Sequence, residues 1–184
     1  MGLGNPGPEY ERTRHNAGFL LLDHLAKEWG FGPFRRADDA VATRGSLHGF
    51  TVRLVKPTTY MNRSGDALRA LRSPTWDPAS DLLVLVDDVS LPPGRFRLRG
   101  AGTPGGHNGL KSIEAALQRQ DYARLRIGVG AKPPEFDHLA DWVLGRMTSE
   151  ERDAFNGALQ PMADAVACWL EHGIETAMTR FNRS

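Results

Sequence analysis

The stretch Leu82-Leu83-Val84-Leu85-Val86-Asp87-Asp88 decides the fold class of this 184-residue chain. Five consecutive apolar residues followed directly by two acids are typical of a strand buried on both faces, in a sheet that helices cover. Ligand sites in open α/β sheets tend to lie beyond the carboxyl ends of such strands. The stretch therefore predicts a strand buried on both faces, and it places Asp87 where chemistry is expected.

Helical and strand patterns alternate on both sides of this strand. Apolar residues from Phe19 to Trp29 recur at helical spacing, which predicts a helix over about 16–29. Residues 50–54 alternate as a half-buried strand and pair plausibly with 40–47 across a His48-Gly49 turn. Further predicted elements are the end of a strand at 1–4, a short helix over 64–71, a helix over 110–118, a strand over 125–129 and a long helical pattern over 147–172, which Pro161 breaks or restarts. The alternation predicts one α/β domain over 1–184, a mixed, mostly parallel twisted sheet surrounded by helices.

The composition narrows the class of protein. Apolar residues make up 40% and charged residues 24% of the chain, as in globular proteins, and no apolar run approaches the roughly 18 residues of a membrane span. No basic start followed by an apolar stretch marks a signal peptide. The single Cys168 lies in an apolar helical pattern and fits a buried structural thiol in a reducing compartment. We therefore expect a cytoplasmic protein without a membrane anchor or internal disulfide.

The charge is unevenly distributed although the net charge is only +1. Glu114 and Asp121 are the only acids from residue 89 to residue 130, a region rich in arginine. A local basic surface of this kind can bind phosphates, although on charge alone a solvated strand face explains it equally well. The candidate phosphate contacts are Arg97, Arg99, Lys111, Arg124 and Arg126.

Two His-Asn dipeptides, His15-Asn16 and His107-Asn108, lie where glycine-containing loops meet helical patterns. Histidine can take a proton near neutral pH, because its ordinary pKa is about 6.5. A carboxylate such as Asp87 can hold one ring nitrogen and leave the other free to accept a proton from water. The pattern favours His15 as a base acting on an ester or amide, against the alternative of an ordinary helix-terminal histidine. We expect Asn16 to cap the first helix.

Two glycine-rich stretches each allow a structural and a functional interpretation. Gly2 to Gly7 matches the dinucleotide fingerprint, but Pro6 stiffens the loop and the helix begins too late to meet a pyrophosphate. A loop that points Asn5 into a cleft fits better, with a plain turn as the alternative. The stretch 100–109 could cradle a phosphate at the start of a helix, yet it lacks the Gly-Lys-Ser/Thr ending of a P-loop.

Other candidate residues have ambiguous roles on their own. Asn62 would be interpreted as a helix N-cap and Met61 as a core residue. No His, Cys or carboxylate pair shows metal-ligand spacing, so the residues give no sign of a metal site. No G-x-S-x-G motif is present, which favours direct attack by water over an acyl-enzyme.

Five blocks in order along the chain resemble bacterial peptidyl-tRNA hydrolase. They are Gly-Leu-Gly-Asn-Pro-Gly from residue 2, Thr-Arg-His-Asn-Ala-Gly-Phe from residue 13, Lys-Pro-Thr-Thr-Tyr-Met-Asn-Arg-Ser-Gly from residue 56, Asp-Asp-Val-Ser-Leu-Pro-Pro-Gly from residue 87 and Gly-Gly-His-Asn-Gly-Leu-Lys-Ser-Ile from residue 105. Residues 122–130 and 142–145 fit the same pattern. The likeness covers essentially the whole chain.

The resemblance implies hydrolysis of the ester between a peptide and the 3′ ribose of tRNA, by a monomer without metal or cofactor, which recycles tRNA released prematurely from ribosomes. It implies that His15 is the general base and that Asp87 orients it. Its substrate groove corresponds to Asn5, Tyr10, Met61, Asn62, His107 and Asn108. Two departures stand out: only Met1 precedes Gly-Leu-Gly, so the first strand is expected to be short, and Pro104 stiffens the glycine-rich loop.

Two other classes of protein remain open at this point. An RNA-binding module without catalysis would keep the basic residues but would have no need of a His15–Asp87 pair, so a hydrogen bond between these two side chains discriminates against it. A different α/β hydrolase or a nucleotide-binding enzyme is the second alternative, and the missing nucleotide motifs count against it.

Overall fold

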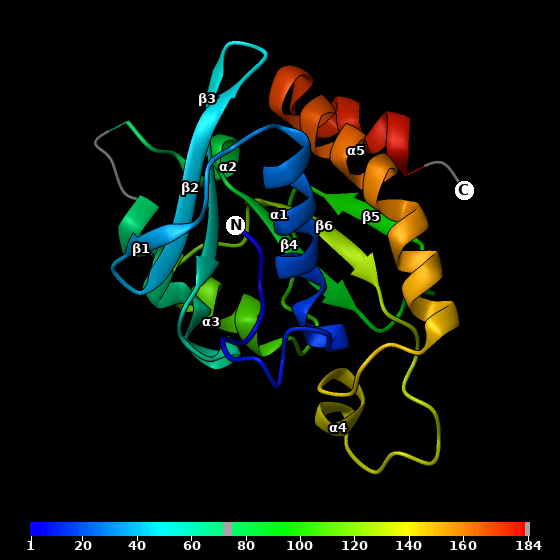
Figure 1. Ribbon diagram of the computed structural model, residues 1–184. Helices are drawn as coiled ribbons and strands as arrows, with labels where there is room; N and C mark the ends of the chain where they lie inside the picture. Colours follow the sequence, from blue (N-terminus) through cyan, green and yellow to red (C-terminus); the bar gives the residue numbers. More distant parts are fainter. Residues whose placement is uncertain (72–74, 183–184) are drawn as a thin grey trace.

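The strand predicted from the apolar run, β4 (Leu83–Asp88), lies at the centre of the computed structural model, which describes residues 1–71 and 75–182 (Figure 1). It pairs in parallel with β6 (Ala123–Gly128), and β6 pairs antiparallel with β5 (Phe96–Arg99). All six residues of β4 are buried, as expected of a strand covered on both faces. Asp87 and Asp88 lie at its carboxyl end.

A second three-stranded sheet is entirely antiparallel. It consists of β1 (Arg35–Ala37), β2 (Ala40–Leu47) and β3 (Phe50–Pro57). The two residues between β2 and β3, His48 and Gly49, both have positive φ, at 49° and 85°. That geometry matches the tight hairpin turns that follow the twist of the strands. The predicted pairing of 40–47 with 50–54 is confirmed, and β3 extends three residues further.

The first three residues join the two sheets. The Gly2 amide donates to Val55 O of β3 at 3.0 Å, and the Leu3 amide donates to Leu85 O of β4 at 2.9 Å. Gly2 forms an isolated parallel bridge with Leu85. The chain therefore lies between β3 and β4 as a short strand-like segment, as the sequence predicts for residues 1–4.

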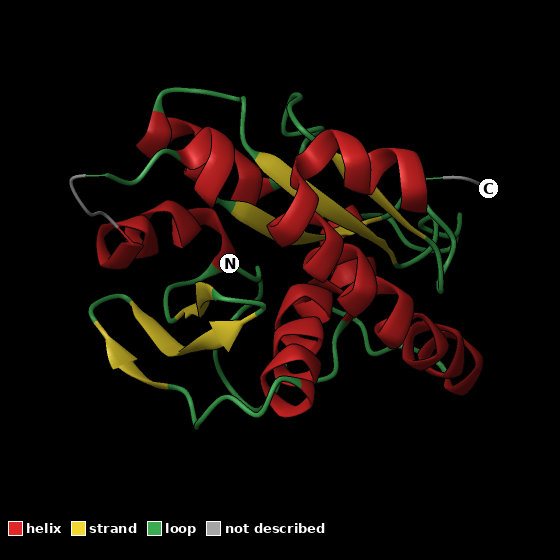
Figure 2. Ribbon diagram, turned by 90° about the horizontal axis from the view of Figure 1, so that it is seen from above, coloured by secondary structure: helices red, strands yellow, loops and turns green. Residues whose placement is uncertain are grey.

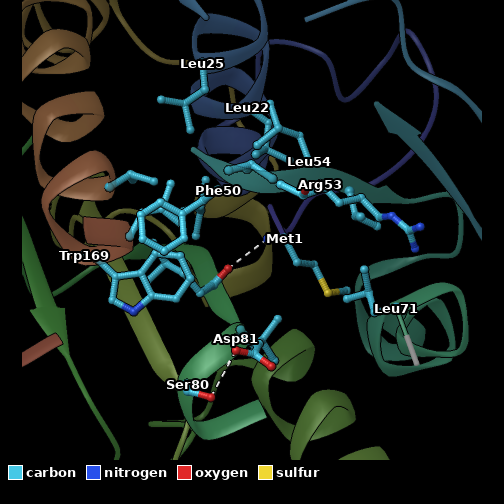
Figure 3. Close-up of a pocket in the computed structure, with 18 of the residues that line it drawn as sticks. Met1, Leu22, Leu25, Phe50, Arg53, Leu54, Leu71, Ser80, Asp81 and Trp169 are labelled. Carbon is cyan, nitrogen blue, oxygen red and sulfur yellow. Dashed lines mark hydrogen bonds between the residues drawn. The ribbon is translucent and has the colours of Figure 1, made fainter. Parts of the chain in front are cut away.

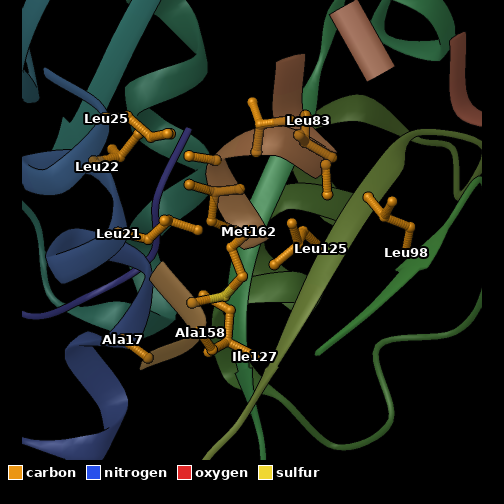
Figure 4. Packing of buried hydrophobic residues seen from close by; sticks show 14 of the residues in the cluster. Ala17, Leu21, Leu22, Leu25, Leu83, Leu98, Leu125, Ile127, Ala158 and Met162 are labelled. Atoms are coloured by element: carbon orange, nitrogen blue, oxygen red, sulfur yellow. The ribbon is translucent and has the colours of Figure 1, made fainter. Parts of the chain in front are cut away.

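Helices cover both faces of the central sheet (Figure 2). The helices α1 (Ala17–Glu28) and α5 (Ser149–Phe181) pack on one face, where Leu21 and Met162 meet Leu125 in the larger core (Figure 4). On the other face, α3 (Asn108–Leu117) and the 3₁₀ segment η2 (Met61–Leu71) bury a second apolar cluster. The short elements are η1 (Arg14–Asn16), α2 (Pro78–Asp81) and α4 (Leu139–Val143).

The predicted α/β class with a mixed sheet and surrounding helices is confirmed. The prediction of mostly parallel pairing is wrong: among the described residues, parallel pairing is limited to β4 with β6 and to the Gly2–Leu85 bridge, while the other three strand pairs are antiparallel. The tight turn at His48 and Gly49 accounts for the antiparallel pairing of β2 with β3.

The break expected at Pro161 is wrong. Pro161 lies inside α5, and the helix leaves helical geometry at Gly173, where φ is 78°. Burial of neighbouring residues such as Met162 and Val166 holds the helix together past the proline. Cys168 is buried on α5, as predicted. Among the described residues, no helix is long and apolar enough to cross a bilayer.

An apolar cavity of about 560 Å³ lies at the amino end of β4, bordered by Met1, Leu25, Phe50 and Trp169 (Figure 3). Asp87 stands at the opposite, carboxyl end of the same strand. The cavity is therefore separate from the residues that the sequence predicts to be catalytic.

We predict that Gly18→Ala lowers the free energy of unfolding by about 1–3 kcal/mol, the usual cost of overpacking. A Cβ at Gly18 would lie 2.6 Å from Leu3 N, 2.7 Å from Leu3 O and against Leu85 O, all backbone atoms that cannot swing away. Urea denaturation measures the change. The control is Gly157→Ala on α5, where a Cβ meets nothing within 4 Å, and which should stabilise by roughly 0.5–1 kcal/mol. Equal midpoints for both variants would contradict the close approach.

Candidate active site

His15 and Asp87 form a hydrogen-bonded pair, although 72 residues separate them in the chain. The Nδ1 atom of His15 lies 3.0 Å from Oδ1 and 2.9 Å from Oδ2 of Asp87. His15 belongs to η1 immediately before α1, and Asp87 lies at the carboxyl end of β4. Both contacts use Nδ1, and among the described residues no hydrogen bond to the Nε2 atom of His15 is observed, so this nitrogen is available to a ligand.

His107 is the second partner of Asp87. Its Nε2 atom lies 2.9 Å from Asp87 Oδ1. Its Nδ1 atom accepts the backbone amides of Gly109 at 3.1 Å and Leu110 at 3.4 Å, so the imidazole caps the amino end of α3. A nitrogen that accepts two N–H groups carries no proton, and the neutral ring must therefore hold its proton on Nε2. The helix cap makes His107 a hydrogen-bond donor to Asp87.

Asp87 is a buried carboxylate between two imidazoles. Burial alone would raise the pKa of Asp87, but the positive charges that His107 and His15 carry when protonated, together with their hydrogen bonds, outweigh it and hold the pKa well below its usual range. The ionised carboxyl can only accept hydrogen bonds, so His15 Nδ1 carries the proton that it shares with Asp87. The lone pair of neutral His15 is consequently on Nε2.

His15, Asp87 and His107 also offer donor atoms that lie within 4.8 Å of one another, an arrangement with the spacing of a metal site. A metal ion would need the lone pair of His107 Nε2. That atom bears the proton fixed by the helix cap, and its removal would leave an anionic ring accepting amides on Nδ1. The hydrogen bonding of His107 thus fits a carboxylate partner better than a metal ligand.

Asn16 and Asn5 are locked together beside this pair. The Asn5 amide donates to Asn16 Oδ1 at 2.8 Å, and Asn16 Nδ2 donates to Asn5 O at 3.0 Å. The Asn5 side chain in turn accepts the Met61 amide at 2.8 Å. Asn16 stands at the N-cap position of α1 but its side chain makes no cap hydrogen bond, so the expected capping role is wrong. The oxygen and the nitrogen of its side-chain amide both bond to the backbone of Asn5 instead.

The predicted substrate residues occupy neighbouring segments around these contacts. Met61 is buried at the start of η2, and Asn62 follows it on the surface. Asn108 is exposed at the start of α3, next to His107. The Tyr10 ring packs edge-on against Tyr60 with 6.4 Å between centroids. A Cβ on Gly109 would touch Met61 Sδ and His107 Cε1, which shows how closely the η2 and α3 segments approach.

The predicted phosphate contacts divide into two kinds. Arg99 and Lys111 are exposed, Arg97 is half-buried, and Arg126 is half-buried and pairs with Asp88 at 2.9 Å. Arg124 as a phosphate contact is wrong. It is 2% exposed, it donates to Thr103 O and Gln120 O, and its guanidinium stacks on Tyr122. The alternation of side chains along β6 predicts on which face of the sheet Arg124 lies. It does not predict that the loop containing Thr103 covers the Arg124 side chain there.

Two features of the site were missed by sequence reasoning. His107 was expected in the substrate groove, and its place before Asn108-Gly109 is the signal that it caps a helix. Arg14 was not singled out at all. It binds Glu151, which lies 137 residues away, and no local pattern reports such a contact.

Comparisons with known proteins show which family the chain resembles. The family model described as Peptidyl-tRNA hydrolase matches residues 1–184. The chain is 49% identical to a peptidyl-tRNA hydrolase of Gemmatimonas aurantiaca, covering 100% of this chain and 98% of the relative, and 47% identical to one of Chloroflexus aurantiacus, covering 99% and 97%. Among solved structures, the peptidyl-tRNA hydrolase of Acinetobacter baumannii superposes with a TM-score of 0.90 at 35% identity, over 98% of this chain and 92% of that one.

We predict that Asn16→Asp lowers the free energy of unfolding by about 1–3 kcal/mol, because the new carboxylate cannot donate to Asn5 O and leaves this buried carbonyl unpaired. The change is measured by chemical denaturation at neutral pH. Asn156→Asp, the same substitution at an exposed position of α5, is the control and should cost little. Equal stability of the two variants would mean that the Asn16–Asn5 contact does not hold the loop.

Proposed function

The chain belongs to the peptidyl-tRNA hydrolase family and is an enzyme that hydrolyses the ester of peptidyl-tRNA, and we propose that His15 is its general base, held by Asp87. The observation that carries the proposal is the contact of His15 Nδ1 with both carboxylate oxygens of Asp87, at 3.0 and 2.9 Å. This contact also counts against a binding module without catalysis, which would have no use for an imidazole held against a buried carboxylate.

In the first step, Nε2 of His15 removes a proton from water while the water oxygen attacks the ester carbonyl carbon. The imidazole becomes an imidazolium, and the Asp87 carboxylate stabilises it through Nδ1–H. General base catalysis of this kind contributes about 10²–10⁴-fold in rate. His107 acts through Asp87, since its Nε2–H occupies Oδ1 and fixes the carboxylate.

In the second step, the tetrahedral oxyanion collapses and the bond to the ribose 3′ oxygen breaks. The leaving oxygen takes the proton from the His15 imidazolium, and the products are a peptide acid and tRNA with a free 3′ hydroxyl. Amide donors from Asn5, Asn62 and Asn108 would stabilise the oxyanion and orient the ester; one such donor is typically worth roughly 3 kcal/mol. Tyr10 and Met61 complete the groove.

Water is preferred as the nucleophile because the nearby serines are engaged. Ser64 is fully buried and its hydroxyl donates to Met61 O at 2.8 Å. The Ser112 hydroxyl accepts the Gly65 amide at 2.9 Å. Cys168 is buried on α5, within the core of the other sheet face. None of these three groups is presented to an ester beside His15.

For the substrate body, we propose that Arg97, Arg99, Lys111 and Arg126 contact tRNA phosphates. Arg97 lies directly opposite Arg126 in the β5–β6 ladder, so that the two cations share one sheet face. We also propose that the enzyme acts in the cytoplasm as a monomer without a cofactor, and that it recycles tRNA released prematurely from ribosomes.

We predict that His15→Ala lowers kcat by about 10²–10⁴-fold without loss of the fold. Asp87→Asn should also lower kcat strongly with little change in tRNA affinity, because an amide facing Nδ1 favours the tautomer with its proton on Nε2. Turnover of a defined peptidyl-tRNA and binding of uncharged tRNA are measured side by side. Asp153→Asn, an exposed substitution on α5, is the control. Wild-type turnover in His15→Ala, or a proportional loss of binding in Asp87→Asn, would refute the assigned roles.

We predict that Arg99→Ala and Lys111→Ala each weaken binding of many tRNAs similarly and reduce the salt slope by about one contact. Both side chains are exposed, so they contribute charge rather than packing. An N-acetylated aminoacyl ester of adenosine, which lacks the tRNA body, should be hydrolysed at the wild-type rate. Arg152→Ala removes an exposed charge on α5 as the control. Equal losses on both substrates would assign these residues to the chemistry or the fold instead.

A further inference from the structure

The residue before His15, Arg14, is a buried cation that the proposed chemistry does not use. Its side chain is only 4% exposed. The guanidinium carbon lies 3.4 Å from the centroid of the Trp142 ring, Nη2 donates to Glu151 Oε2 at 2.6 Å, and Nη1 donates to Trp142 O at 3.3 Å. A buried charge is costly unless it is paired and hydrogen-bonded, so this arrangement implies a specific role for the site.

The partners of Arg14 come from two helices that lie far from Arg14 in the chain, 128 residues away for Trp142 and 137 for Glu151. Trp142 belongs to α4, and its indole N–H donates to Gly130 O at 3.0 Å. Glu151 lies in the first turn of α5, where it forms a capping box with Thr148 and accepts the Thr148 amide at 2.8 Å. Trp142 and Glu151 are therefore each held in place by hydrogen bonds that do not involve Arg14.

The backbone around Arg14 is tied to the same region. The Arg14 amide donates to Gly145 O at 3.0 Å, and Thr13 forms an antiparallel bridge with Arg146. On the other side of His15, Asn16 is held by Asn5. The segment η1 has only three residues, too few to stabilise itself, and so its position is set by these flanking contacts.

We propose that Arg14 is a positioning residue that fixes His15 against Asp87 by tying η1 to α4 and to the amino end of α5. The proposal rests on the proposed role of His15 as base. A general base must hold its nitrogen within hydrogen-bond reach of the attacking water, and a displacement of 1 Å can cost about 10²-fold in rate. Arg14 affects the rate by fixing the position of His15, and it does not contact the substrate.

The contacts require a guanidinium and not simply a positive charge. One planar group lies on the indole and donates in its plane to a carboxylate and to a carbonyl from different elements. A lysine ammonium is a point charge that could pair with Glu151 but could not satisfy all three contacts at once. Arg14→Lys thus keeps the positive charge but loses the planar group that makes the three contacts together.

The test measures kcat and KM for peptidyl-tRNA in Arg14→Lys, Arg14→Met and Glu151→Gln. We expect kcat to fall by about 10²-fold in Arg14→Met and less in Arg14→Lys, with KM unchanged because Arg14 is closed to the substrate. Val166→Ala, a truncation of a buried core residue on α5, is the control for lost stability alone, and its kcat should stay at the wild-type value. Circular dichroism and urea midpoints establish the folded fraction of each variant.

The double variant Arg14→Lys with His15→Ala separates positioning from general destabilisation. If Arg14 acts through His15, adding Arg14→Lys to His15→Ala lowers kcat no further. Additive losses of kcat in the double variant would overturn the proposal. The proposal would also fail if the Arg14 variants changed KM at constant kcat, or if their kcat per folded molecule equalled that of Val166→Ala. Should Arg14→Met fail to fold, Arg14→Lys and Glu151→Gln decide by the same criteria. Failure of the proposed function is a separate result, wild-type turnover in His15→Ala alone.

Discussion

The close passage of residues 2–4 between β3, β4 and α1 is the constraint on which the rest of the structure depends. Gly2 bonds to Val55 on one side while Leu3 bonds to Leu85 on the other, and this segment connects the two sheets by backbone hydrogen bonds. The absence of a side chain at Gly2 and Gly18 allows α1 to lie directly on the segment. Because α1 is held this close to β4, the turn before the helix arrives at the carboxyl end of that strand.

That geometry explains why a buried carboxylate can be kept ionised there. Asp87 loses its water on burial, but two imidazole N–H groups replace it from elements that the packing brings together. The same short loop that follows Gly4 delivers Asn5, whose backbone and side chain connect Asn16 with Met61. The site is therefore rigid because its parts are also structural contacts between η1, η2 and the first loop.

Sequence predicted the elements with strong patterns and the residues at their ends. The apolar run before Asp87, the β2–β3 hairpin and α1 were all found, because each pattern is local. The weak elements β1, β5 and α4 lack such periodicity and form only when packed on their neighbours. The burial of Arg124, the contact of Arg14 with Glu151 and the contact of His107 with Asp87 all span 20 or more residues, which no window of sequence contains.

The amino ends of two helices lie near Asp87, and both contribute a partial positive charge to the electrostatic potential at the site. His15 precedes α1 and His107 caps α3, so the partially positive amino ends of both helices lie on the side of the carboxylate. Such ends favour negative charge, and they are fixed before any substrate arrives. An ester that enters beside His15 would develop its oxyanion in this same field, next to the exposed Asn108 at the first position of α3. The same helix ends would therefore favour the negative charge that the proposed reaction creates.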